Sequence, residues 1–152
     1  MRRRRFIGAG AAVAAAAALG ARAQGGLAPS QDLTPFIAKI TGGKPVERGG
    51  IEIEIPAVAE NGNSVPTRIR VASPMSPEDH VDAVHVFAPR NPRPHVATFH
   101  LGPQAARAEI STRIRLAGTQ KLTAIAEMSD GTYWSDSQEV IVTLAACLED
   151  LI

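Results

Sequence analysis

The stretch Ile51-Glu52-Ile53-Glu54-Ile55 alternates strictly between an aliphatic and a charged side chain. Successive side chains of a β-strand point to opposite faces of the sheet, so this period of two predicts a strand with one buried and one solvated face. The same alternation recurs in Ile110-Ser111-Thr112-Arg113-Ile114-Arg115-Leu116. The chain has 11 prolines, and most lie between such runs, which argues against a helical fold.

Further apolar or alternating runs extend the pattern to about seven short strands. They are the segments Arg68–Val71, Val84–Phe87, Val96–Leu101, Leu122–Ala126 and Val140–Leu144. Turn-forming residues separate the runs, for example Glu60-Asn61-Gly62-Asn63 and Ser129-Asp130-Gly131. This spacing in a chain of domain size predicts an all-β, immunoglobulin-like β-sandwich that extends over residues 30–144.

A short N-terminal helix is predicted from Ser30 to Ile40, because apolar side chains recur there at helical spacing. Ser30 or Asp32 is a suitable N-cap for this helix. The glycines of Thr41-Gly42-Gly43 are expected to end it.

The chain opens with the features of an export signal. Four arginines, Arg2–Arg5, precede an alanine-rich apolar run from Ile7 to Leu19, and Ala21-Arg22-Ala23 forms a small-x-small cleavage site. The apolar run is too short to span a bilayer, which takes about 20 residues. We therefore expect residues 1–23 to be a signal of the twin-arginine type, residues 24–29 a flexible leader, and the mature protein to be periplasmic.

Removal of this signal changes the sign of the net charge. It takes away five of the 16 basic residues and no acid, which leaves 11 basic residues (16 − 5) against 15 acidic ones, a net charge of about −4. A mildly acidic protein is a poor binder of nucleic acid, and the mature chain has no second apolar run, so neither nucleic acid nor a membrane is an expected partner.

The four histidines and the single cysteine raise the question of a metal site. His80, His85, His95, His100 and Cys147 match in kind the ligands of the superoxide reductase iron site, which also lies on an immunoglobulin-like fold. That family places a histidine shortly after its cysteine, whereas no histidine follows His100 here. No pair has the short spacing that closes a metal site, so the sequence predicts no metal centre and no cofactor.

Other polar residues give weaker signals. Glu52 and Glu54 share one strand face, which is typical of a solvated face rather than of a catalytic carboxylate pair. Arg113 and Arg115 form a basic stripe that either meets an anion or is simply solvated. Tyr133-Trp134, expected in or just after a turn, either covers one end of the sandwich or contacts a partner.

The most informative residue is Cys147, the only cysteine of the chain. A lone thiol in an exported protein is inert, pairs with another chain, or reacts. It follows the last predicted strand after only Ala145 and Ala146, so residues 145–152 are expected to form an arm that presents the thiol to other proteins. Alternatively, Cys147 packs beside Leu148 as a small hydrophobic residue.

Several strings taken together resemble a known family. They are Glu60-Asn61-Gly62-Asn63-Ser64-Val65-Pro66, Ser73-Pro74-Met75, His85-Val86-Phe87-Ala88 with Asn91-Pro92, Ala97-Thr98-Phe99-His100, Ser111-Thr112-Arg113-Ile114-Arg115-Leu116-Ala117 and Ala126-Glu127-Met128-Ser129-Asp130-Gly131. From about Leu33 to Cys147 the chain resembles the SoxY family, the sulfur-carrier subunits of the periplasmic thiosulfate-oxidising (Sox) system.

The resemblance implies a carrier rather than an enzyme. It implies a complex with a SoxZ-like subunit and sulfur carried covalently on Cys147. It also implies transient docking to three partner enzymes: a haem cytochrome that couples thiosulfate to the cysteine, a hydrolase that releases sulfate, and a molybdenum–haem dehydrogenase that oxidises the remaining sulfane sulfur.

The carrier arm departs from the family pattern, which ends Gly-Gly-Cys-Gly-Gly. Ala145 and Ala146 replace the first two glycines, and Leu148-Glu149-Asp150-Leu151-Ile152 follows the cysteine. Alanine narrows the backbone freedom of the arm, and the acidic residues disfavour the thiolate. Two functions stay open on this basis: a sulfur carrier with an altered arm, or a divergent module that binds a SoxZ-like partner while its cysteine is structural or forms an intermolecular disulfide.

Overall fold

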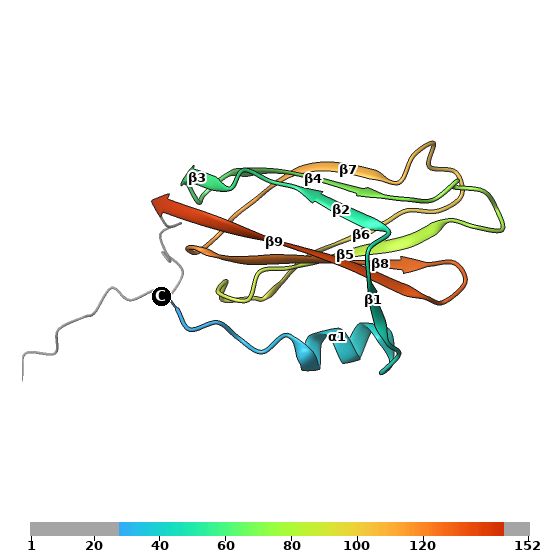
Figure 1. Cartoon of the computed structure of the whole chain (residues 1–152), viewed down its shortest axis with the longest axis horizontal. Helices are drawn as coiled ribbons and strands as arrows, with labels where there is room; N and C mark the ends of the chain where they lie inside the picture. Colours follow the sequence, from blue (N-terminus) through green and yellow to red (C-terminus); the bar gives the residue numbers. More distant parts are fainter. Residues whose placement is uncertain (1–27, 145–152) are drawn as a thin grey trace, which may run out of the picture.

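The computed structural model describes residues 28–144, which form one helix and nine strands (Figure 1). The elements are α1 (Thr34–Thr41), β1 (Val46–Arg48), β2 (Ile51–Glu54), β3 (Val58–Asn61), β4 (Val65–Val71), β5 (Val81–Phe87), β6 (His95–His100), β7 (Glu109–Ile114), β8 (Gln120–Met128) and β9 (Tyr133–Leu144). The predicted signal (1–23), most of the leader (24–29) and the arm (145–152) lie outside the described residues. Within residues 28–144, no helix has the length and apolarity needed to cross a membrane.

The strands form two sheets that pack face to face, which confirms the predicted all-β sandwich. One sheet has the order β1-β9-β8-β5-β6, with β3 also paired to β9, and the other has the order β2-β4-β7. β9 is paired with β8 along one edge. Its other edge is shared by β1 at the start and β3 at the end, both parallel to it. Between β1 and β3 the chain crosses to the other sheet as β2.

The core lies between the sheets, and strands such as β2 and β4 contribute their alternate residues to it. The side chains of Val65, Ile69, Leu116, Leu122 and Val140 are fully buried there. The alternation of β2 is observed as predicted, since Ile51 and Ile53 are buried and Glu52 is exposed. The core therefore occupies the positions that the period of two had indicated.

Helix α1 covers part of the outer face of the larger sheet. Phe87, Ile125 and Tyr133 form a second apolar cluster there, against which Phe36 and Ile40 pack. The Tyr133 hydroxyl donates a hydrogen bond to the backbone carbonyl of Ile40 at 3.2 Å. Tyr133 is thus a buried anchor for the helix, and Figure 1 shows α1 below the start of β9.

The helix exists as predicted but begins four residues later than Ser30. The carboxylate of Asp32 accepts hydrogen bonds from the Thr34 backbone N–H at 2.9 Å and from the Thr34 hydroxyl at 2.7 Å. These bonds close a turn ahead of the helix, so the N-cap is Leu33 rather than Ser30 or Asp32. The end is as expected, since Gly42 takes a left-handed conformation with φ 62°.

Two strands beyond the predicted seven are present in the described residues, namely β1 and β3. They have three and four residues, and neither shows a clear apolar alternation. The last strand is also longer than Val140–Leu144, because it begins at Tyr133 immediately after the turn at Asp130. Trp134, one residue into that strand, packs partly buried against the main core.

A side chain of β9 links the two sheets by a hydrogen bond to β2, the edge strand of the smaller sheet. The Asp136 carboxylate accepts a hydrogen bond from the backbone N–H of Ile53 in β2, at 3.0 Å. This contact satisfies a donor on the side of β2 that faces away from β4.

We expect Asp136→Ala to lower the free energy of unfolding by about 1.5–3 kcal/mol, because a hydrogen bond to a charged group is lost. Urea denaturation measures this change. Asp136→Asn is the matched control, since it retains an acceptor oxygen, and it should lose less. Equal losses for the two variants would show that this bond does not stabilise the sandwich.

Candidate functional site

The candidate site is the end of β9, because the predicted arm follows it directly. Leu144 is the last residue of the strand. The predicted carrier residues Ala145, Ala146, Cys147 and Leu148 lie outside the described residues. What the structure defines is therefore the root from which the arm leaves.

Backbone hydrogen bonds fix this root. The Gly62 N–H donates to the carbonyl of Leu144 at 2.8 Å, and the Leu116 N–H donates to the carbonyl of Gly62 at 2.8 Å. One residue before the end, the Thr143 hydroxyl donates to the carbonyl of Glu60 at 3.1 Å. The turn after β3 thus joins the end of β9 to the segment that follows β7.

A buried pair of side-chain amides holds that segment in turn. Asn91 Nδ2 donates to the carbonyl of Arg115 at 2.8 Å, and Asn91 Oδ1 accepts from the Ala117 N–H at 2.9 Å and from Gln120 Nε2 at 3.1 Å. Asn91 and Gln120 are only 9% and 5% exposed. At such burial an unpaired amide is costly, so this network specifies one arrangement of the loops around Leu116.

A threonine completes the support from the β8 side. The Thr119 hydroxyl accepts a hydrogen bond from the Val142 N–H at 2.9 Å. It also lies 3.5 Å from the Val142 carbonyl oxygen. The end of β9, just before the predicted arm, is therefore held by residues from three loops that are distant in sequence. The strings Glu60-Asn61-Gly62-Asn63, Asn91-Pro92 and Arg115-Leu116-Ala117 converge here.

The histidines lie elsewhere. His85 Nδ1 is 3.1 Å from the Thr98 hydroxyl, which is 2.9 Å from His95 Nε2. His85 Nε2 is 3.4 Å from the Glu127 carboxylate. These groups lie on the larger sheet and are already paired with one another. No group of three or more histidine or acidic side chains between residues 28 and 144 has a geometry that holds a metal ion.

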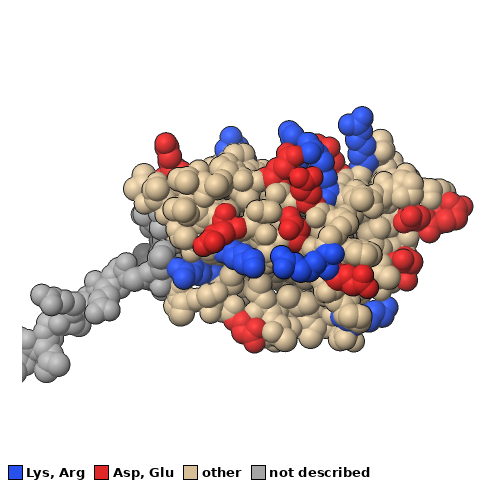
Figure 2. All heavy atoms as spheres, viewed as in Figure 1, with Lys and Arg blue, Asp and Glu red and all other residues tan. Residues whose placement is uncertain are grey.

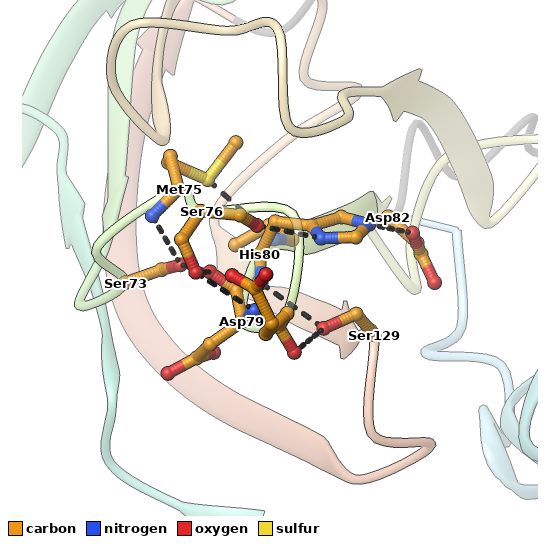
Figure 3. A network of polar contacts seen from close by, with 9 residues as sticks. Ser73, Met75, Ser76, Asp79, His80, Asp82 and Ser129 are labelled. Carbon is orange, nitrogen blue, oxygen red and sulfur yellow. Dashed lines mark hydrogen bonds and ion pairs between the residues drawn. The ribbon is translucent and has the colours of Figure 1, made fainter.

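His80 lies apart from the other histidines, in a polar network at the opposite end of the sandwich (Figure 3). Its Nδ1 is 3.0 Å from the Ser76 carbonyl, and its Nε2 is 3.0 Å from the Asp82 carboxylate. Its backbone N–H donates to the Ser129 hydroxyl at 3.0 Å. The string Ser73-Pro74-Met75 belongs to this network, since the Met75 N–H donates to the Ser73 hydroxyl at 3.1 Å. These hydrogen bonds fix the loop between β4 and β5.

The outer face of the smaller sheet carries paired charges. Glu54 forms ion pairs with Arg68 and Arg70, and Glu109 pairs with the same two arginines. Their side chains are 32–47% exposed, and pairs of that exposure contribute little to stability. Figure 2 shows acidic and basic side chains interleaved rather than separated by sign. Glu54 is thus part of a solvated ion-pair network, as the alternation had indicated.

The predicted basic stripe is also solvated. Arg113 is exposed and donates to the Ser64 carbonyl and hydroxyl, both at 3.3 Å. Arg115 is exposed as well, and its carbonyl is the one held by Asn91. The sequence had singled out these arginines for their charge, but it did not indicate that the backbone of Arg115 supports the root of the arm.

Comparison with known proteins identifies the family of this chain. The model of the family "Sulfur oxidation protein SoxY" matches residues 37–147, so the match ends at Cys147. The chain belongs to the SoxY family. The sulfur carrier protein SoxY from Chlorobium limicola f thiosulfatophilum is 31% identical, with a TM-score of 0.62, and the match covers 74% of this chain and 96% of that one. None of the curated proteins matches this SoxY-family chain.

Superoxide reductases share the fold at lower identity. The enzyme from Ignicoccus hospitalis is 16% identical with a TM-score of 0.55, covering 62% of this chain and 80% of that one. The enzyme from Nanoarchaeum equitans is 21% identical with a TM-score of 0.52, covering 63% and 100%. At this identity the likeness concerns the sandwich alone.

We expect Asn91→Ala to lower the free energy of unfolding by about 1–3 kcal/mol, because buried partners of the amide lose their hydrogen bonds. Urea denaturation gives the value. Asn63→Ala is the matched control, since Asn63 is exposed in the neighbouring turn and should change stability by less than about 0.5 kcal/mol. A loss for Asn91→Ala no greater than the control's would contradict the structural role of the amide network.

The stability of the sandwich should also depend on His85. Burial lowers the pKa of His85 below its ordinary value of 6.5, and the hydrogen bond to Glu127 only partly opposes this. Electrostatic repulsion from His95 and His100 lowers the pKa of His85 further. The folded protein therefore binds fewer protons at His85 than the unfolded chain does near pH 6.5, so stability is full above that pH and falls below it.

We accordingly expect Tm to fall as the pH drops from about 7.5 to about 5.5, the range in which histidine titrates. The fall should be smaller in His85→Gln, which removes the titration but keeps polar atoms facing Thr98 and Glu127. Thermal unfolding at several pH values measures both slopes. Equal slopes in parent and variant would exclude His85 as the titrating group.

Proposed function

We propose that this SoxY-family chain is a periplasmic sulfur carrier that binds sulfur intermediates covalently at Cys147. The observation that carries the proposal is the extent of the family match, which ends at the only cysteine of the chain. The fixed end of β9 supports it, because a thiol three residues beyond a rigid root is confined to a small volume near the protein. Such confinement favours presentation to a partner's active site.

Loading at Cys147 is an oxidation. The thiolate and thiosulfate join through a new sulfur–sulfur bond to give a cysteine S-thiosulfonate, and two electrons leave. A haem cytochrome of the kind that the family implies accepts those electrons. This chain supplies only the thiol, its proton and the arm that presents them, so the chain is a substrate carrier and not an enzyme.

Unloading begins with a hydrolysis that needs no oxidant. Water attacks the terminal sulfone group, which leaves as hydrogen sulfate, and the sulfane sulfur stays on Cys147 as a persulfide. The family implies that a molybdenum–haem dehydrogenase oxidises this sulfur further. A SoxZ-like subunit is the proposed stable partner, and export by a twin-arginine signal places the complex in the periplasm.

The chain, incubated with thiosulfate and the haem cytochrome that couples it, should gain one thiosulfonate group per molecule. Intact mass spectrometry measures the gain, and reduction with dithiothreitol should remove it, because the link is a sulfur–sulfur bond. Cys147→Ser should give no adduct, since the nucleophilic sulfur is absent. An adduct that persists in Cys147→Ser would refute the proposal.

The same samples distinguish the other function considered for this family member, an interaction module without carrier turnover. A stable cysteine-dependent dimer on a non-reducing gel, with no thiosulfonate adduct in the presence of active cytochrome, would assign Cys147 to an intermolecular disulfide. A monomeric band with the adduct supports the carrier.

A further inference from the structure

The large hydrophobic side chains that are exposed within residues 28–144 gather at one place. They are Val58, Ile141 and Leu144, with exposed fractions of 53%, 50% and 67%. Val58 lies beside Ile141 in the register of β3 and β9, and Asn61 lies beside Leu144. We call these three residues the root patch: Val58 and Ile141 share the outer face of the larger sheet, and Leu144, the last residue of β9, points to the opposite face at the same end of the strand. Figure 1 shows β3 beside the end of β9.

Val58 and Ile141 of the root patch form the uncovered end of a face that is covered elsewhere. Tyr133 and Ile141 have the same parity along β9, and the pairing of β9 with β8 has no register shift between Tyr133 and Val140. They therefore point to the same outer face. Helix α1 packs over Tyr133, whereas Ile141 is half exposed. Single exposed hydrophobic residues are ordinary, but a cluster at a functional end of a protein marks a contact surface.

The length of the arm fixes what can lie there. Cys147 is three residues beyond Leu144, and three fully extended residues span about 10 Å. Any protein that takes the thiol into its active site must therefore approach Leu144 to about that distance. At this range its surface meets the root patch, because the patch includes Leu144 itself and, three residues back along β9, Ile141 with its partner Val58.

We propose that the root patch is the docking surface for the proteins that load and unload Cys147, and that they meet it with an apolar rim around the mouth of the active site. This inference rests on the proposed carrier function. Docking buries Val58, Ile141 and Leu144, and removing their apolar surface from water stabilises the complex.

The charges beside the patch define the partner further. Glu60 follows Val58 on the same face of β3, and Glu139 precedes Ile141 on β9. Both are exposed, and Lys121 lies opposite Glu139 in the β8–β9 register. Two carboxylates against one ammonium leave an acidic excess on this face. The rim of the partner therefore carries basic residues outside its apolar part.

The test compares two variants that place a charge in the patch with one that places it far away. Val58→Lys and Ile141→Lys change exposed side chains and should leave the fold intact. Ala106→Lys is the matched control: Ala106 is exposed and lies between β6 and β7, at the opposite end of the sandwich. The probe is the haem cytochrome that couples thiosulfate, and the readout is the rate at which the adduct appears in the intact mass.

We expect Val58→Lys and Ile141→Lys each to slow loading at least tenfold, while Ala106→Lys stays within twofold of the parent. Alkylation of Cys147 by iodoacetamide should keep its parent rate in all three variants, because this small reagent needs no docking surface. If the parent is not loaded at all, the carrier function fails. If the parent is loaded and the patch variants match it, docking at the patch is wrong and the carrier function stands.

Two further outcomes would overturn the docking assignment. A homodimer of the parent in solution that dissociates on Ile141→Lys would show that the patch binds a second copy of this chain. Loss of a stable second subunit from the purified complex of either patch variant would assign the patch to subunit assembly. An unchanged assembly together with slowed loading supports docking.

Discussion

One backbone hydrogen bond, from the Gly62 N–H to the carbonyl of Leu144, fixes the position at which the chain leaves its sandwich. Gly62 is itself bonded to Leu116, whose neighbours Arg115 and Ala117 are held by the buried amide of Asn91. Hydrogen bonds to three loops therefore hold the end of β9, although it lies at the end of a sheet. A protein that carries a reactive group beyond its last strand needs such a fixed starting point, because any displacement of the end of the strand also displaces the reactive group.

The fold was accessible from sequence because the strands of the smaller sheet are solvated on one side. In β2 and β7 the period of two is clear, and burial of Ile51, Ile53, Ile110 and Ile114 follows it. β1 and β3 escaped prediction because each has three or four residues and is defined by parallel pairing with β9, a contact between segments about 80 residues apart. The helix start escaped because the Asp32 carboxylate is engaged in the turn before the helix.

The site was accessible only in part. Cys147 and the arm were predicted from composition and position, since a lone cysteine beyond the last strand is inert, pairs with another chain or reacts, and they lie outside the described residues. The residues that hold the root were noticed only as strings that resemble a family. Asn91 and Gln120 are separated by 29 residues, and nothing local to either shows that their amides meet. The exposure of Val58 and Ile141 likewise depends on where α1 packs, which a linear pattern does not reveal.

The separation of only three residues between Leu144 and Cys147 has a kinetic consequence for a carrier that serves several enzymes. Under the proposed docking, all the enzymes that act on Cys147 cover the same few side chains. Two of them then cannot occupy the protein together, and every transfer waits for the previous enzyme to dissociate. Throughput is then governed by dissociation rather than by encounter. A carrier of this kind therefore works faster with short-lived complexes of modest affinity than with tight ones.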